Sequence, residues 1–390
     1  MKMTFFACTA LFCWAVPLFS QPQYARITTT MADVRAAPKI EDKTPKPPVL
    51  FMESNRYTQV LFGSLVQVEP SQENDWLKVR IPFQWFSEGN NVYERNVRWS
   101  TISGYMQKNQ TELINDQNID WQNNLVVKSF WGALYSRPDI TAEKKDVSMG
   151  SCFYGIPVPG SNYWHVGIKT SEHTMHPLGF MKDTDLEFIG AKQPLDPEIL
   201  RKKFVSATML FLDHHVQYVW GGVSAQTPTG LIGSQCTGPD CSGLTYLAAL
   251  VCGLYIPRNS GSQYAFCEPI ERGADLEYGD LVFLYQENAL TMRHVMVYVG
   301  DDMLAETSGV PFLHGGVCLS AQKSFGKSLK DLVSHDIIDR WWPLQEGDTH
   351  TLRYGICFGS LFKNKEKLAR MRKAVQSPLQ SHELFSDTAQ

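Results

Sequence analysis

A cysteine at the start of an apolar helix is the feature that most constrains this chain. Asp240-Cys241-Ser242-Gly243 follows a loop rich in Gly, Pro, Ser and Thr and opens the apolar run LTYLAALVCGLYIP. Backbone N–H groups at a helix start are unpaired and partly positive, which biases a thiol there toward the reactive thiolate. Asp240 and Ser242 suit these positions because their side chains accept from such N–H groups. The alternative is a structural cysteine, since free cysteines are often small core residues.

A basic partner for the cysteine lies further along the chain. The run RHVMVYVG, residues 293–300, alternates and is β-branched, which predicts a strand with His294 at its start. A helix N-terminus and a strand can bring a Cys and a His together although they are far apart in sequence. Glu306 follows the turn after this strand and would face His294 if the two segments pair. Together, Cys241, His294 and Glu306 predict a nucleophile, its base and a group that orients the base.

The order of the motifs resembles the NlpC family of cell-wall cysteine peptidases. D-C-S-G-L is followed by LYIPRNS, YGDLVF and HVMVYVG, and Tyr218-Val219-Trp220-Gly221-Gly222 upstream matches the family's Y-x-W-G-G. The resemblance covers residues 218–300. It implies a papain-like core in which Cys241 is the nucleophile and His294 the base.

Two features depart from the family pattern. The third catalytic position is most often His, less often Asn or Gln, and here it is Glu306. A carboxylate can also orient an imidazole, so we keep Glu306 in that role. The segment from Tyr218 to Cys241 is longer than is usual in the family. Its extra loop, within SAQTPTGLIGSQCTGP, is expected to form part of the cleft rim, and its Cys236 has no role that the sequence explains.

The resemblance also implies a substrate. Family members cut peptidoglycan stem peptides, typically between γ-D-glutamate and a diamino acid such as meso-diaminopimelate or lysine. Members with two SH3-like domains before the peptidase often require a free N-terminal L-Ala, whose amine is held by the residues flanking the cysteine. On this basis Asp240 and Ser242 would bind the amine, and Tyr218 would line the cleft. Helix capping and aromatic packing are the corresponding structural alternatives.

Two other classes of function stay open. The chain could be a non-catalytic cell-wall-binding adaptor with a vestigial peptidase core. It could also perform another chemistry on the same core, as a muramoyl–L-Ala amidase or an acyltransferase. A γ-glutamyl peptidase that needs a free L-Ala would not cut while L-Ala is attached to muramic acid, whereas the amidase would.

The whole chain is predicted to be an α+β protein in which two small all-β barrels precede the papain-like core. Residues 31–107 have short alternating strands with turn signals, and resemble a bacterial SH3-like domain through D-V-R-x-x-P, T-Q-V-L-F-G, D-W-L-K-V-R and G-Y-M. Residues 125–187 repeat this scheme more loosely. The catalytic domain is expected over residues 199–370, opening with the helix LRKKFVSATMLFLDHHVQYVW.

Residues 1–20 have the pattern of a secretory signal peptide. One Lys precedes a short apolar run, and no Cys lies at the expected cleavage site to predict a lipoprotein. No later stretch is apolar enough to span a membrane. We therefore expect a monomer in the periplasm or outside the cell.

Net charge and cysteine content bear on nucleic-acid binding, disulfide bridges and metal sites. The net charge of −4 gives no electrostatic argument for nucleic acid. The cysteines outside the signal segment are odd in number, which fits one free nucleophile plus bridges that we leave unassigned, and Cys252 is expected to be buried and free. The Cys and His spacings lack the pairs of zinc sites, so no metal or other cofactor is expected. The basic segment KNKEKLARMRKAVQ is expected to be a helix with a solvated face.

Overall fold

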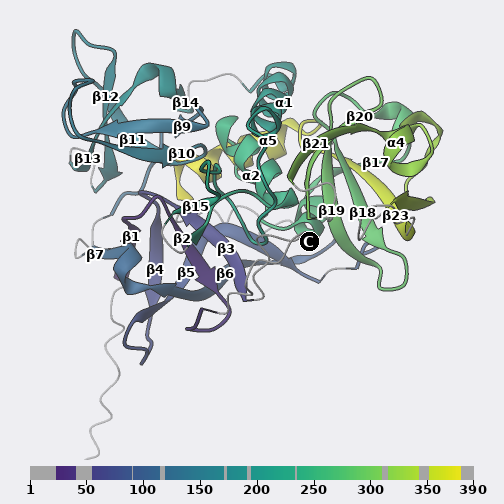
Figure 1. The fold of residues 1–390 in the computed structure, drawn as a ribbon, viewed down its shortest axis with the longest axis horizontal. Coiled ribbons are helices and arrows are strands. Elements are labelled where there is room, and N and C mark those ends of the chain that lie inside the picture. Colours follow the sequence, from purple (N-terminus) through teal and green to yellow (C-terminus); the bar gives the residue numbers. More distant parts are fainter. Residues whose placement is uncertain are drawn as a thin grey trace, which may run out of the picture.

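The computed structural model describes residues 23–40, 55–89, 91–114, 119–170, 174–190, 195–232, 235–309, 315–341 and 351–378. The expected signal peptide lies outside these residues. Three sheets, each of a separate stretch of chain, make up most of the fold. Two of them form the left side of Figure 1 and the third, in green, forms the right side, with the helices α1, α2 and α5 between.

The first β unit is one antiparallel sheet in the order β3-β2-β6-β5-β4-β1-β7. Its strands alternate as the sequence predicts, so that Ile102, Gly104 and Met106 of β6 are buried while their neighbours are not. Strand pairing extends beyond residues 31–107 at both ends. The strands are β1 (Gln23–Ile27), β2 (Met31–Arg35), β3 (Arg56–Leu61), β4 (Leu65–Glu69), β5 (Trp76–Glu88), β6 (Arg98–Gln107) and β7 (Thr111–Ile114).

The second β unit has the same strand order as the first. Its sheet runs β10-β9-β13-β12-β11-β8-β14, which is the order of the first sheet with each strand replaced by its counterpart. In both units a short 3-10 turn precedes the last strand. The strands are β8 (Leu125–Val127), β9 (Trp131–Tyr135), β10 (Lys144–Ser148), β11 (Cys152–Pro157), β12 (Tyr163–Lys169), β13 (Met175–Lys182) and β14 (Leu186–Phe188).

The C-terminal unit combines helices with an antiparallel sheet in the order β17-β23-β18-β19-β20-β21, and β22 also pairs with β23. Helix α2 packs against α1 and against strands β19 and β20. The elements are α1 (Pro197–Asp213), β15 (Leu231–Ile232), β16 (Gln235–Cys236), α2 (Cys241–Val251), α3 (Ser260–Phe266), β17 (Glu268–Ile270), β18 (Leu281–Gln286), β19 (Thr291–Tyr298), β20 (Met303–Ser308), β21 (Gly315–Ser320), α4 (Ala321–Phe325), β22 (Ile337–Trp341), β23 (Thr351–Ser360) and α5 (Lys365–Gln376).

Helix α1 is shorter than the sequence predicts. Asp196 caps its N-terminus by accepting from the N–H of Glu198, and Pro197 occupies the first turn. The helix ends at Asp213, and His215 then takes a left-handed backbone conformation with φ of 49°. The motif Y-x-W-G-G therefore lies in a loop rather than at the end of the helix.

Helix α5 is the basic amphipathic helix that the sequence predicts, with a solvated charged face and a buried apolar face. Leu368, Met371, Ala374 and Val375 are fully buried against the core. The guanidinium of Arg372 is buried too, and donates to the backbone carbonyls of the residues that end α2. The amphipathic pattern thus marks a packed helix, and its charges line the outer face.

One hydrophobic cluster runs through all three units. It joins residues of the first sheet and the second β unit with α1, α2 and the inner face of the third sheet. No helix in the described part of the chain has the length and apolar character needed to cross a membrane.

Candidate active site

Cys241 is the first residue of α2, as the sequence predicts. Asp240 caps the helix by accepting from the N–H of Gly243 at 2.6 Å. Every residue of α2 is buried. The cysteine is therefore held on a rigid, fully packed element, with its thiol 6% exposed at the floor of a cavity.

Two glycines of the motifs let three chain segments meet beneath the cysteine. A Cβ on Gly222 would lie 2.0 Å from the carbonyl oxygen of Gly238, and a Cβ on Gly243 would lie 2.1 Å from the carbonyl oxygen of Gly222. Neither approach is possible for a residue with a side chain. The second Gly of Y-x-W-G-G and the Gly of D-C-S-G are thus needed to pack the loop onto the start of α2.

The ionisation of Cys241 differs from the thiolate that its helix position suggests. Burial, followed by the nearby carboxylate of Asp240, raises the pKa of the Cys241 thiol to about 12. The N–H groups of Val295 and Ser242 and the charge of Arg258 act in the opposite direction but do not compensate. The Cys241 side chain is therefore a neutral thiol, because desolvation outweighs the partial charge of the helix end.

His294 and Glu306 meet on adjacent strands. Strands β19 and β20 pair with Val297 opposite Ala305, and Nε2 of His294 contacts the carboxylate of Glu306. The guanidinium of Arg340, on β22, donates to both oxygens of Glu306 at 2.7 and 2.8 Å. Glu306 and then Arg340 thus stand in a buried row behind the imidazole of His294.

This row fixes the charge and the tautomer of the imidazole. Although burial acts to raise it, Arg340 and then His294 hold the pKa of Glu306 at about 2. An ionised carboxylate only accepts, so Nε2 of His294 carries the proton and Nδ1 is left as the basic nitrogen. Burial lowers the pKa of His294 below its ordinary value, although Glu306 opposes this. His294 is therefore neutral and able to take a proton at neutral pH.

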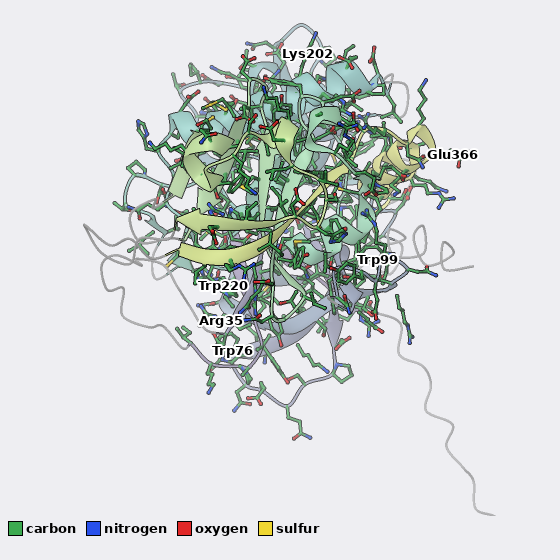
Figure 2. The ribbon with its side chains drawn as sticks, turned by 90° about the vertical axis from the view of Figure 1, so that its right-hand side faces the viewer. Arg35, Trp76, Trp99, Lys202, Trp220 and Glu366 are labelled. Carbon is green, nitrogen blue, oxygen red and sulfur yellow. The ribbon has the colours of Figure 1, made fainter. Side chains whose placement is uncertain are left out.

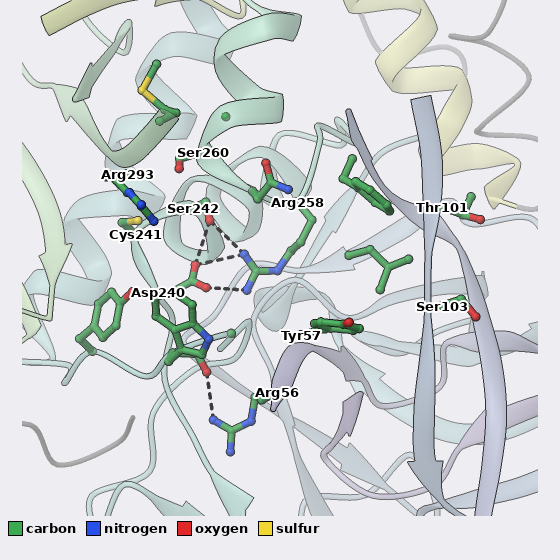
Figure 3. Close-up of a pocket in the computed structure, with 18 residues that line it drawn as sticks. Arg56, Tyr57, Thr101, Ser103, Asp240, Cys241, Ser242, Arg258, Ser260 and Arg293 are labelled. Atoms are coloured by element: carbon green, nitrogen blue, oxygen red, sulfur yellow. Dashed lines mark hydrogen bonds and ion pairs between the residues drawn. The ribbon is translucent and has the colours of Figure 1, made fainter. Parts of the chain in front are cut away.

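Asp240 has a second partner besides the helix. Arg258, from the segment LYIPRNS, donates to both of its carboxylate oxygens at 3.0 and 2.8 Å, and Ser242 donates to one of them. Figure 3 shows Asp240, Ser242 and Arg258 joined by dashed lines to the right of Cys241. Asp240 and Ser242 both line the cavity, and both also perform the structural roles that the sequence left open.

Two cavities flank the catalytic groups. The first, of about 720 Å³, contains Cys241 with Asp240, Ser242 and Ser260, and the second, of about 710 Å³, contains His294. Tyr218, Trp220 and Arg293 line both cavities. Burial raises the pKa of Tyr218 well above its ordinary range, so its hydroxyl keeps its proton.

The first β unit supplies one wall of the Cys241 cavity. Tyr57, Phe86, Thr101, Ile102 and Ser103 line it from strands β3, β5 and β6. In Figure 3, Thr101 and Ser103 lie on the side away from Cys241 and Arg293, with Tyr57 between. A substrate bound to the thiol would therefore meet the first β unit within a few residues.

The inserted loop before Cys241 does not form the cleft rim that the sequence suggests. None of its described residues between positions 223 and 239 lines either cavity. It forms the hairpin of β15 and β16 and packs against the β units, where Gln59 donates to the carbonyl of Cys236 and Trp131 donates to that of Gln226. All seven cysteines outside the first 20 residues, Cys236 and Cys252 among them, are free, and Cys252 is buried as expected. Within the described residues no group of His, Cys, Asp or Glu could hold a metal ion.

Sequence reasoning missed two arginines and one whole surface. Arg340 lies in a stretch without a readable motif, and Arg258 stands inside LYIPRNS, whose Pro-Arg step could have been examined as a partner for Asp240. The side chains from the first β unit carry no local signal at all, because strand positions in an unrelated sheet give no hint of the cleft that they face.

Comparison with known proteins agrees with this geometry. Residues 215–316 match the NlpC/P60 family. Over 96 residues the chain is 38% identical to the peptidoglycan endopeptidase RipB of Mycobacterium tuberculosis, covering 24% of this chain and 38% of RipB. The chain therefore spans well under half of the length of that relative.

Two other similarities extend over more of the chain. Dipeptidyl-peptidase 6 of Lysinibacillus sphaericus is 24% identical over 259 residues, which are 64% of this chain and 79% of that protein. The crystal structure of an NlpC/P60 family protein from Bacillus cereus matches 76% of this chain and 94% of its own, with a TM-score of 0.54 and 18% identity. The structural match indicates a shared fold that includes much of the N-terminal part.

Proposed function

We propose that this chain, which carries an NlpC/P60 domain at residues 215–316, is a cysteine endopeptidase of peptidoglycan stem peptides. The observation that carries the proposal is the row of Arg340, Glu306 and His294, which orients a neutral imidazole on β19. The next residue of that strand, Val295, interacts through its N–H with the thiol of Cys241 at the start of α2. An adaptor that only binds would have no need of an oriented base beside a buried thiol.

The chemistry follows from this arrangement. The Cys241 sulfur attacks the amide carbonyl carbon while Nδ1 of His294 accepts the thiol proton. N–H groups at the start of α2 face the oxygen that becomes negative. The imidazolium then gives its proton to the leaving amine as the C–N bond breaks. Water attacks the resulting thioester with His294 as base, and the thiol is restored.

The wall formed by the first β unit supports an enzyme that takes a short N-terminal segment. Tyr57, Thr101 and Ser103 line the cavity beside Cys241, and we infer that they limit the segment that can bind before the scissile bond. A relative whose match covers 64% of this chain is named dipeptidyl-peptidase 6, which supports the same inference. We infer hydrolysis of the γ-D-glutamyl–diamino acid bond of a stem peptide with a free N-terminal L-Ala.

Asp240, Ser242 and Tyr218 are our candidates for binding the L-Ala end. All three line the cavity, and Tyr218 keeps its proton as a donor. Because Arg258 already balances the charge of Asp240, an ammonium would gain less there than from an unpaired carboxylate. N-acetylation of the substrate amine should therefore weaken binding for two reasons. The amine loses hydrogen bonds, and the acetyl group takes up space in the cavity.

We further propose that the two β units are SH3-like domains and that the protein acts as a monomer in the periplasm or outside the cell. Their shared strand order supports a duplication of one small β module. Export rests on the signal-like segment of residues 1–20.

Digestion of defined peptides tests the proposal. L-Ala–γ-D-Glu–meso-diaminopimelate and its N-acetylated form would be incubated with wild type, Cys241→Ala and Glu306→Gln, and the products identified by mass spectrometry. We expect L-Ala–D-Glu from the free peptide, none with Cys241→Ala, and a rate lower by roughly 10²- to 10⁴-fold with Glu306→Gln, which cannot hold the ring as a charged acceptor.

The other outcomes discriminate between the remaining functions. Equal cleavage of both peptides would keep the endopeptidase and remove the amine requirement. Cleavage only of muramoyl-linked peptides, between muramic acid and L-Ala, would identify the amidase. An inert thiol with all of these substrates, combined with binding to intact cell wall, would identify the adaptor.

A further inference from the structure

The two cavities differ in which part of a substrate they can hold. The amine that leaves must take a proton from His294, so it has to lie on the His294 side of the thiol. This assignment rests on the proposed function. The cavity of Cys241, lined on one side by the first β unit, then holds the acyl side, and the cavity lined by His294 holds the diamino acid.

The described lining of the diamino-acid cavity is rich in arginine. Arg293, Arg340 and Arg353 line it, and Glu287 is the one carboxylate among its described lining residues. Arg340 is held by Glu306, and Arg353 lies 3.4 Å from Glu287. Two of the three guanidinium groups are thus matched by a carboxylate inside the protein.

Arg293 carries the third guanidinium group of this cavity. Its Nε and Nη2 donate to the amide oxygen of Gln286 at 3.2 and 3.0 Å, a neutral acceptor. Among the described residues no carboxylate forms an ion pair with Arg293, and its side chain is exposed. It lines both cavities, and Figure 3 shows it beside Cys241. A positive charge therefore lies between the two cavities, beside Cys241.

A bulge in the sheet turns Arg293 toward this point. In a regular strand neighbouring side chains point to opposite faces, so Arg293 and His294 would be separated. Here Leu284 pairs with His294 and the next residue, Tyr285, pairs with Met292, which leaves Arg293 as the extra residue. The irregularity lets both side chains line the same cavity.

We propose that Arg293 binds the side-chain carboxylate of the leaving diamino acid, so that the protein prefers meso-diaminopimelate to lysine or to amidated diaminopimelate. A guanidinium pairs with a carboxylate through two parallel hydrogen bonds, which a side-chain amide or a lysine methylene cannot reproduce. Glu287, in the same cavity, faces the side-chain ammonium that all of these diamino acids share.

Three peptides that share L-Ala–γ-D-Glu test the proposal. They end in meso-diaminopimelate, in its side-chain amide or in L-Lys, and kcat/KM is measured for wild type, Arg293→Gln, Glu287→Gln and Arg137→Gln, an exposed arginine of the second β unit. We expect wild type and Arg137→Gln to prefer the free diaminopimelate peptide by roughly 10- to 100-fold, the range of a charged hydrogen-bond pair. Arg293→Gln should abolish this preference by lowering the rate for the free diaminopimelate peptide to the level of the other two peptides. Glu287→Gln should lower all three rates alike.

Equal rates for the three peptides with wild type would overturn the inference, as would a uniform loss with Arg293→Gln, which would place that guanidinium on the shared γ-D-glutamyl carboxylate. Calorimetric binding of the peptides to Cys241→Ala separates this result from failure of the proposed function. Selective binding that depends on Arg293, without cleavage by wild type, would keep the pocket and reject the endopeptidase. Binding without selectivity would reject the pocket.

Discussion

At the scale of single residues, the site is controlled by burial more than by formal charge. The Cys241 thiol stays protonated because it is desolvated and faces Asp240, whereas Glu306 stays ionised because Arg340 and His294 surround it. Burial raises the pKa of both acidic groups, and the nearby charges decide the net direction: Asp240 adds to the effect of burial at Cys241, whereas Arg340 and His294 outweigh it at Glu306. The consequence is a neutral thiol and a neutral imidazole in the resting protein.

This resting state predicts the pH dependence of Cys241 alkylation. With a folded pKa of about 12, the thiolate fraction below that value rises with pH. The iodoacetamide rate at Cys241 should therefore rise roughly tenfold per pH unit from pH 6 to 9. Peptide mass spectrometry would separate Cys241 from the half-buried Cys236 and Cys318. A rate that is already constant near pH 6 would instead show a preformed thiolate–imidazolium pair.

At the scale of elements, the start of α2 depends on a side chain from outside the helix. Asp240 caps the helix and also pairs with Arg258, whose guanidinium is 3% exposed. A helix cap alone contributes about 1 kcal/mol, whereas removing one partner of a buried ion pair costs about 3–5 kcal/mol because the other charge is left uncompensated. The ion pair is therefore the larger contribution to the stability of the nucleophile's position.

The contributions of the helix cap and of the ion pair can be separated by making the same Asp-to-Asn substitution at two helix caps. Asn caps a helix as well as Asp, so Asp240→Asn should keep the cap and lose about 3 kcal/mol or more of unfolding free energy through Arg258. Asp196→Asn, at the exposed cap of α1, should lose about 0.5 kcal/mol or less. Denaturant unfolding of both variants provides the comparison. Equal losses would mean that Arg258 contributes nothing beyond the cap.

At the scale of the whole molecule, the first β unit is built into the catalytic unit. Gln59 accepts from the N–H of Val223 and donates to the carbonyl of Cys236, while Arg56 donates to the carbonyl of Trp220. Arg258 donates to Thr58 of the same strand. Figure 2 shows Trp220 next to the part of the first unit that contains Arg35. The loop of Y-x-W-G-G is thus held in place by a β module that precedes it by more than a hundred residues.

We expect Gln59→Leu to damage catalysis as well as folding. The fully buried side chain would lose its bonds to Val223 and Cys236, and each buried group left unsatisfied costs about 1–3 kcal/mol. Displacement of the loop should lower kcat/KM by roughly tenfold or more. Gln67→Leu on β4, whose side chain makes no hydrogen bond to described residues, is the matched control. If the Gln59→Leu variant is destabilised but keeps the kcat/KM of wild type, the first β unit does not contribute to catalysis.

Short segments of the sequence were enough to predict the elements that they encode. The start of α2 at Cys241 and the strand that carries His294 are readable because each depends on residues close together in the chain. The contact between His294 and Glu306 followed from one turn between two strands, and alternation indicated the strands of both β units.

Only the tertiary structure decided what surrounds those groups. The pairing of Arg340 with Glu306 and of Arg258 with Asp240, the neutral thiol, the wall from the first β unit and the bulge at Arg293 all depend on burial or on contacts across distant segments. Desolvation and ion pairing are set by every neighbour in space, and a local pattern does not specify those neighbours. For the same reason the inserted loop, which the sequence assigns to the cleft rim, packs against the β units instead.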